Sequence, residues 1–267
     1  MHFRLVRRFC GLLSVLVLGL ALLPGAGISS LAQAQDSDEP SIQAEPGTER
    51  YQRLKARRAS QQDGDAGNAG KTAASVSAAH AISGKSGRSN EGLIIPVDST
   101  RQDSLASNDD SSTDAISLGF DFIFYGETRS SVYINNNGNL SFEKAISAFT
   151  PDSFPLTDTS MVAPFWADVD TSPEESGIVY YRVYSEADRM VVTWDSVGYF
   201  GDNTDKLNTF QVILSTKEDP VTTVGKNVCL AYGDMEWTTG DASNGENGFG
   251  GAPATAGVNK GDGESYA

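Results

Sequence analysis

The stretch that decides the fold is Met161–Asp170, with the sequence MVAPFWADVD. Three apolar residues lead into a Pro-Phe-Trp cluster, and two carboxylates, Asp168 and Asp170, follow at positions i and i+2. Residues two apart in a strand share one face of the sheet. The pattern therefore predicts one buried strand over residues 161–170, whose far end turns acidic where it leaves the core.

Further strands are predicted on both sides of this stretch, with turn residues between them. Residues 116–124 alternate along the chain as a half-buried strand does. The run Asn135-Asn136-Asn137-Gly138 predicts a tight turn, because Asn and Gly tolerate positive φ. The remaining expected strands span residues 132–134, 140–142, 177–184, 190–195, 210–215, 228–237 and 253–258. Since no segment of residues 113–267 has a sustained helical period, we expect an all-β fold, an antiparallel β-sandwich or barrel-like domain.

Composition divides the 267 residues into three parts. Residues 1–34 have a basic start, an apolar run and a final Ala-Gln-Ala, which predicts a cleaved secretory signal. An uncleaved anchor is the alternative, but the apolar run is short for a membrane span. Residues 35–112 are rich in Ser, Ala, Gly and Asp and predict a disordered linker, with Leu93–Pro96 expected as its first ordered piece, an edge strand. Residues 113–267 hold all three Trp and predict one β domain.

The chain is strongly acidic, with a net charge of −15. Nucleic acids and anionic membrane surfaces are bound through basic patches. We therefore expect no nucleic-acid partner and no membrane insertion after signal cleavage. An acidic surface suits a soluble extracellular protein, a divalent cation or a basic partner, and it also occurs as an ordinary solvated face.

The two cysteines differ in their predicted fate. Cys10 lies in the predicted signal and would leave with it, so that Cys229 would be alone in the secreted chain. A single cysteine has no internal disulfide partner. Because Cys229 stands in an apolar strand segment, we expect a buried structural thiol.

Asp168 and Asp170 are the candidate metal ligands. Carboxylates are hard oxygen donors, and calcium takes about six to eight oxygens. The loop residues Asp202 and Asp205 are further donors. The pattern is consistent with a calcium site, although it lacks EF-hand spacing, and a hydrated strand end without a metal is the alternative.

The same two carboxylates also raise the possibility of catalysis. Asp168 and Asp170, helped by Asp195 or Asp234, have the residue types of an acid–base pair in a secreted carbohydrate- or protein-hydrolysing enzyme. No nucleophile–base set accompanies them. A hydrolase is therefore the alternative hypothesis, and we expect no enzyme.

The aromatic residues fall into two groups. The three tryptophans stand in predicted strands, where such side chains usually belong to the core; they are Trp166, Trp194 and Trp237. Tyr199 and Phe200 instead begin a predicted polar loop over residues 199–206, so they are the candidates for exposed binding residues. Long polar loops at 144–160 and 239–252 would complete such a contact surface.

One sequon is present, at Asn139-Leu140-Ser141. It follows directly on the predicted turn at 135–138, so we expect the Asn139 side chain to face solvent. Glycosylation of Asn139 then depends on the host.

Several short motifs occur in a recognisable order over residues 118–263. They are FIFYG at 122–126, VYINNNG at 132–138, VAPFWADVD at 162–170, NTFQ at 208–211 and AGVN at 256–259. In these motifs the chain resembles the nidogen extracellular domain, a family also found in alpha-tectorin and large mucins. The resemblance implies a secreted or cell-surface, non-catalytic module in cell–matrix adhesion, with a matrix protein or surface polysaccharide as partner. Because family members usually continue into a final strand, it also implies that the domain is incomplete at its C-terminus.

Overall fold

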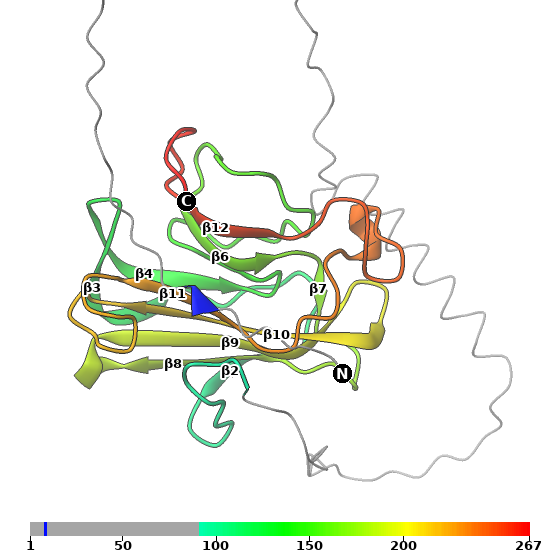
Figure 1. The fold of residues 1–267 in the computed structure, drawn as a ribbon, viewed down its shortest axis with the longest axis horizontal. Coiled ribbons are helices and arrows are strands. Elements are labelled where there is room, and N and C mark those ends of the chain that lie inside the picture. Colours follow the sequence, from blue (N-terminus) through cyan, green and yellow to red (C-terminus); the bar gives the residue numbers. More distant parts are fainter. Residues whose placement is uncertain (1–7, 10–90) are drawn as a thin grey trace, which may run out of the picture.

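Two antiparallel β-sheets pack face to face in the computed structural model, which describes residues 8–9 and 91–267 (Figure 1). The sheets do not close on each other, so the fold is a sandwich and the all-β prediction is confirmed. The described helices are two short 3-10 turns, η2 (Ser185–Ala187) and η3 (Asp241–Ser243). In this part of the chain no helix has the length and apolar character needed to cross a membrane.

The first sheet follows the order β1-β11-β10-β9-β8-β2, and β7 adds to β9. Its strands are β1 (Arg8–Phe9), β2 (Asp103–Leu105), β7 (Val169–Asp170), β8 (Val179–Tyr184), β9 (Arg189–Tyr199), β10 (Asn203–Ser215) and β11 (Val228–Tyr232). The second sheet follows the order β12-β6-β5-β4-β3. Its strands are β3 (Ile116–Phe124), β4 (Glu127–Asn135), β5 (Asn139–Ser141), β6 (Met161–Trp166) and β12 (Thr255–Asn259).

The central stretch does not form one strand, so that prediction is wrong. Its first part is β6, which pairs with β5 and β12 in the second sheet. Its last part is β7, which pairs with β9 in the first sheet. Ala167 and Asp168 lie between the two, and their backbone groups are satisfied by other loops: Ala167 N donates to Asn137 O (3.2 Å), and Phe200 N donates to Asp168 O (3.0 Å). The stretch therefore joins the two sheets at one end of the sandwich.

The core lies between the sheets and is rich in aromatic residues. Trp194 stacks on Phe210 with ring centroids 5.0 Å apart, and Phe165 packs against both Phe210 and Trp237. Each indole N–H donates to a backbone carbonyl, as a buried tryptophan requires: Trp166 to Ala148, Trp194 to Asn136 and Trp237 to Val197. All three tryptophans are buried, which confirms their prediction as core residues.

The predicted turn at 135–138 is present, and all four of its residues are buried. The Asn136 side chain donates to Val169 O and Asp109 O, both at 2.7 Å, and its Oδ1 accepts from Thr171 Oγ1. Gly138 has a φ of +75°, and a Cβ there would lie 1.8 Å from Phe165 O. The turn is thus packed under the passage from β6 to β7, and it ties that passage to the segment before β3.

Asn139 is buried for the same reason. Its side chain has no exposed area; Oδ1 accepts from Asn135 Nδ2 (2.7 Å), and Nδ2 donates to Asn137 O. The expectation that this side chain faces solvent is therefore wrong. The local sequence pattern could not show that the turn is covered by other segments.

Two segments beyond the turn also differ from expectation. The predicted loop at 199–206 is mostly strand, because β9 runs to Tyr199 and β10 begins at Asn203. The predicted strand at 228–237 ends early, at Tyr232. Residues 199–206 are mostly polar, so the sequence predicted a loop there. They form strand because the backbones of β9 and β10 pair with each other.

The fold includes residues that the sequence assigns to the linker. The buried Gln211 side chain accepts from Ile94 N and Ile95 N and donates to Ile95 O (2.8 Å), so Leu93–Pro96 is held as an irregular segment and not as an edge strand. Strand β2 pairs with β8. The linker boundary at 112 is thus too late. The rest of the predicted linker and the predicted signal lie outside the described residues, apart from β1, whose backbone pairs with β11.

Cys229 is buried, as predicted, but it is not a lone thiol. It is disulfide-bonded, and the described residues hold no second cysteine. The prediction of an unpaired Cys229 is therefore wrong. It depended on removal of Cys10 with the signal, and Cys10 lies outside the described residues.

We predict that Asn136→Ala lowers the free energy of unfolding by about 1–3 kcal/mol, because it leaves buried carbonyl groups without a donor. Urea denaturation of the full chain measures this. Asn227→Ala is the control, since the Asn227 amide makes a surface hydrogen bond to Ile123 O. An equal loss in both variants would contradict the role given to Asn136.

We also predict that Asn139 carries no glycan in the folded protein, even when it is expressed in a host with N-glycosylation. A glycan needs an exposed amide, and this amide is enclosed by Asn135 and Asn137. Peptide mapping by mass spectrometry checks the occupancy. A natively folded fraction with glycosylated Asn139 would show that this turn opens.

Candidate functional site

Loops from distant parts of the chain meet where β6 passes into β7. Phe149, Phe200 and Ala242 pack together there, and Thr150 Oγ1 lies 2.9 Å from Ser243 Oγ. The loops expected at 144–160 and 239–252 are thus brought to the turn between β9 and β10. We call this region the acidic loop end; its acidic residues are Asp109, Asp110, Asp168, Asp202, Asp205, Asp241 and Glu246.

Three carboxylates of the acidic loop end form a compact cluster. Oxygens of Asp109, Asp110 and Asp168 all lie within 4.8 Å of one another. Asp168 is 1% exposed, and the other two are half-buried. Asn137 Nδ2 donates to Asp110 Oδ1 (3.0 Å), which fixes that side chain beside the buried turn. Grouped carboxylates repel one another, and a bound cation relieves the repulsion.

The close approach of the last loop explains why Asp168 is enclosed. Gly240 lies directly against it, and a Cβ on Gly240 would stand 2.4 Å from the Asp168 Cβ. Only a residue without a side chain fits there. The loop that carries Asp241 is therefore held against the Asp168 cluster.

Asp170 is not part of this cluster. It is fully buried in β7, and its Oδ1 accepts from Ser172 N (2.9 Å). The structure thus groups Asp168 with Asp109 and Asp110, not with its sequence neighbour. The sequence analysis did not identify Asp109 and Asp110, because they lie in a segment with the composition of a linker. The one signal for a metal site there was that the two aspartates are adjacent in the sequence.

The buried pair Asp168 and Asp170 does not support the hydrolase hypothesis. An acid–base pair must reach its substrate, whereas these side chains are 1% and 0% exposed. Asp195 Oδ1 accepts from the neighbouring Ser196 hydroxyl. The cavity described below is lined by none of these residues.

Tyr199 and Phe200 are not exposed, so their prediction as surface contact residues is wrong. Tyr199 is 1% exposed and its hydroxyl donates to Asp205 Oδ1 (2.8 Å); burial, followed by this hydrogen bond, raises its pKa. Phe200 is 8% exposed in the cluster with Phe149. Their position in a tight hairpin, not in a long loop, places both rings inside.

Phe249 is an exposed aromatic residue of the acidic loop end that the sequence analysis did not single out. It is 48% exposed between two glycines with positive φ, Gly248 and Gly250, and the Lys206 ammonium lies 5.9 Å from its ring centroid. Such an exposed ring is a candidate contact residue. The signal in the sequence was a single Phe flanked by glycines.

Three carboxylates lie on the segments near Phe249, beside the Lys206 ammonium that approaches its ring. Burial raises the pKa of Asp241, and the charges of Asp205 and Glu246 add to this effect. Asp205 has the opposite shift, because the Lys206 and Tyr199 hydrogen bonds lower its pKa. These carboxylates make the surface around the ring attractive to a cationic partner.

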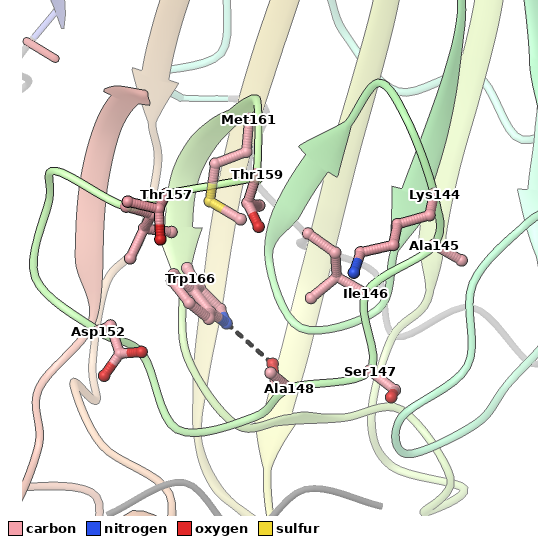
Figure 2. A pocket seen from close by; sticks show the side chains of 11 residues that line it. Lys144, Ala145, Ile146, Ser147, Ala148, Asp152, Thr157, Thr159, Met161 and Trp166 are labelled. Atoms are coloured by element: carbon pink, nitrogen blue, oxygen red, sulfur yellow. Dashed lines mark hydrogen bonds between the residues drawn. The ribbon is translucent and has the colours of Figure 1, made fainter. Parts of the chain in front are cut away.

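A separate cavity of about 370 Å³ lies under the loop at 144–160, which we call the crossing loop, on the outer face of β6 (Figure 2). Its floor consists of Met161 and Trp166. The rest of its lining comes from the loop: Lys144, Ala145, Ile146, Ser147, Ala148, Asp152, Leu156, Thr157 and Thr159. The hydrogen bond from Trp166 Nε1 to Ala148 O (2.9 Å) holds the loop on this floor.

We propose that calcium binds at Asp109, Asp110 and Asp168, and not at the expected pair of Asp168 and Asp170. We predict that calcium at about one hundred times its dissociation constant raises the melting temperature of the full chain by roughly 5–10 °C. Differential scanning fluorimetry with calcium and with a chelator measures this. Asp168→Asn should abolish the shift, because it removes a charged ligand.

Asp188→Asn is the matched control, since Asp188 is exposed in the β8–β9 turn with φ +46° and Asn also adopts that conformation. This variant should keep the full calcium shift. A melting temperature that does not respond to calcium in the parent chain would contradict the proposal.

Comparison with known proteins gives relatives that are much longer than this chain. Human alpha-tectorin is 36% identical over 181 residues, which cover 58% of this chain and 8% of that protein. Drosophila melanogaster nidogen is 35% identical over 133 residues, 41% of this chain and 10% of that protein. Mouse nidogen-2 is 31% identical over 145 residues, 43% of this chain and 10% of that protein. The chain thus spans a tenth or less of the length of these relatives.

No solved structure matches the chain. A family model described as NIDO related matches residues 88–265, which include β2 to β12, the acidic loop end and the cavity. The match also begins before the expected boundary at 113, in agreement with the segment held by Gln211. The chain therefore belongs to the NIDO-related family.

Proposed function

We propose that the protein is a secreted, non-catalytic adhesion domain that binds an extracellular matrix protein. The observation that carries this proposal is the family match over residues 88–265, together with the similarity to proteins named nidogen and alpha-tectorin. The predicted signal at 1–34 supports an extracellular location. The burial of Asp168 and Asp170 supports a function without catalysis.

The acidic loop end is the proposed contact surface. Loops at one end of a rigid sandwich are a common place for binding residues. Here the Gly240–Asp168 packing and the Thr150–Ser243 hydrogen bond hold the loops in place. A surface that is already ordered loses less entropy when a partner binds.

The chemistry of this surface defines the partner. An exposed aromatic ring at the centre of a polar rim is a frequent source of binding energy in protein interfaces. Phe249 supplies the ring, and Asp205, Asp241 and Glu246 supply negative charge around it. The matching partner is a matrix protein with a basic face, and lysine or arginine side chains on it can also approach the Phe249 ring.

We predict that the full chain binds saturably to at least one protein in a panel of immobilised matrix proteins, and that added salt weakens binding because the attraction is partly electrostatic. Phe249→Ala should weaken binding about tenfold or more, as expected for a central aromatic contact. Surface plasmon resonance measures both effects.

Val224→Ala is the control. Val224 is 72% exposed in the β10–β11 loop, at the opposite end of β10 from the turn that leads to Lys206. It should bind like the parent chain. Failure of the folded parent chain to bind any matrix protein would overturn the proposed function, and equal losses in both variants would overturn the proposed surface.

A further inference from the structure

The cavity under the crossing loop is preformed by the sandwich. Met161 and Trp166 project from β6 to the outer face of the second sheet, where they pack with Ile146, Ala148, Phe154 and Leu156. Because β6 pairs with β5 on one side and β12 on the other, the floor is a rigid element. The site thus has an apolar base that does not depend on a bound partner.

Polar side chains line the upper part of this cavity. Figure 2 shows Lys144 and Asp152 on opposite sides of Met161 and Trp166. Ser147, Thr157 and Thr159 also belong to the lining. Within the part of the chain that the structure describes, Lys144 makes no ion pair, and the three hydroxyl groups make no side-chain hydrogen bond. Burial raises the pKa of Asp152, which also lines the cavity.

The lining selects among ligand classes. A purely apolar ligand would contact only the floor and would make no use of the Lys144 ammonium group or of the three hydroxyls. A peptide that binds by adding a strand needs an open strand edge for its backbone, and both edges of β6 are paired. A sulfated polyanion would be repelled by a chain of net charge −15 that offers one lysine here.

A sugar ring with one carboxylate meets all these conditions. It has an apolar C–H face for the floor, hydroxyls around its edge and one negative charge. The volume of about 370 Å³ is near the lower end of the range of about 300–1,000 Å³ for small-molecule sites. This size suits one or two sugar units and excludes a long buried chain.

We propose that this cavity binds a terminal hexuronic acid unit of a polysaccharide. The sugar carboxylate pairs with the Lys144 ammonium, ring hydroxyls bond to Asp152 and to the hydroxyls of Thr157 and Thr159, and the C–H face lies toward Met161 and Trp166. The inference rests on the proposed function, because it names a second ligand through which the domain adheres.

The test compares two sugars that differ at one position, methyl glucuronoside and methyl glucoside, by ligand-detected NMR titration of the full chain. We expect the glucuronoside to bind about tenfold tighter or more, because a charge-assisted hydrogen bond is added. Lys144→Gln should remove this preference. Thr159→Val should weaken both sugars, because it removes a hydroxyl and keeps the side-chain shape.

Lys217→Gln is the control for Lys144→Gln, since Lys217 is an exposed lysine in the β10–β11 loop. It should keep the full preference, and melting curves should show that every variant is folded. Absence of binding, equal binding of the two sugars, or an unchanged preference in Lys144→Gln would overturn the sugar site, as would binding of an acidic dipeptide in place of both sugars.

The two proposals fail in different ways. Matrix-protein binding that depends on Phe249, without sugar binding, would overturn the cavity assignment and leave the adhesion surface standing. Sugar binding that depends on Lys144, without binding to any matrix protein, would overturn the proposed protein partner and leave the cavity assignment standing.

Discussion

The rest of the structure depends on the passage of one stretch of chain from the second sheet into the first. Only Ala167 and Asp168 separate β6 from β7. Yet β6 pairs with β5 and β12 in the second sheet, whereas β7 pairs with β9 in the first sheet. The peptide groups between them cannot join either ladder, so other segments must supply their hydrogen bonds. Asn137 O and Phe200 N do so, and the Asn136 side chain donates to Val169 O at the start of β7.

This requirement explains the position of the acidic loop end. The turn that contains Asn136 must lie under the passage, and the β9–β10 turn must lie beside it. Asp168 is the residue at the passage itself, so the loops that satisfy the backbone also enclose its carboxylate and bring Asp109 and Asp110 close to it. A structural junction and a cluster of potential ligands thus occupy the same place.

The two candidate surfaces use different properties of one fold. The acidic loop end presents charge and one exposed ring on loops fixed by the core. The cavity under the crossing loop uses the outer face of β6, which would be exposed without that loop. Trp166 serves both structure and site, because its indole holds the loop through Ala148 and forms the floor. The family match covers both regions.

The sequence by itself determined the fold class, the buried tryptophans and most strands. A half-buried strand alternates apolar and polar residues with a period of two, and this alternation can be read from the residue types alone. It also carried the family resemblance through short motifs such as VYINNNG and VAPFWADVD. Only the tertiary structure decided the break at Ala167–Asp168, the burial of Asn139 and Tyr199, the exposure of Phe249 and the grouping of three aspartates. These features depend on contacts between residues far apart in sequence, and a local pattern carries no information about what covers it.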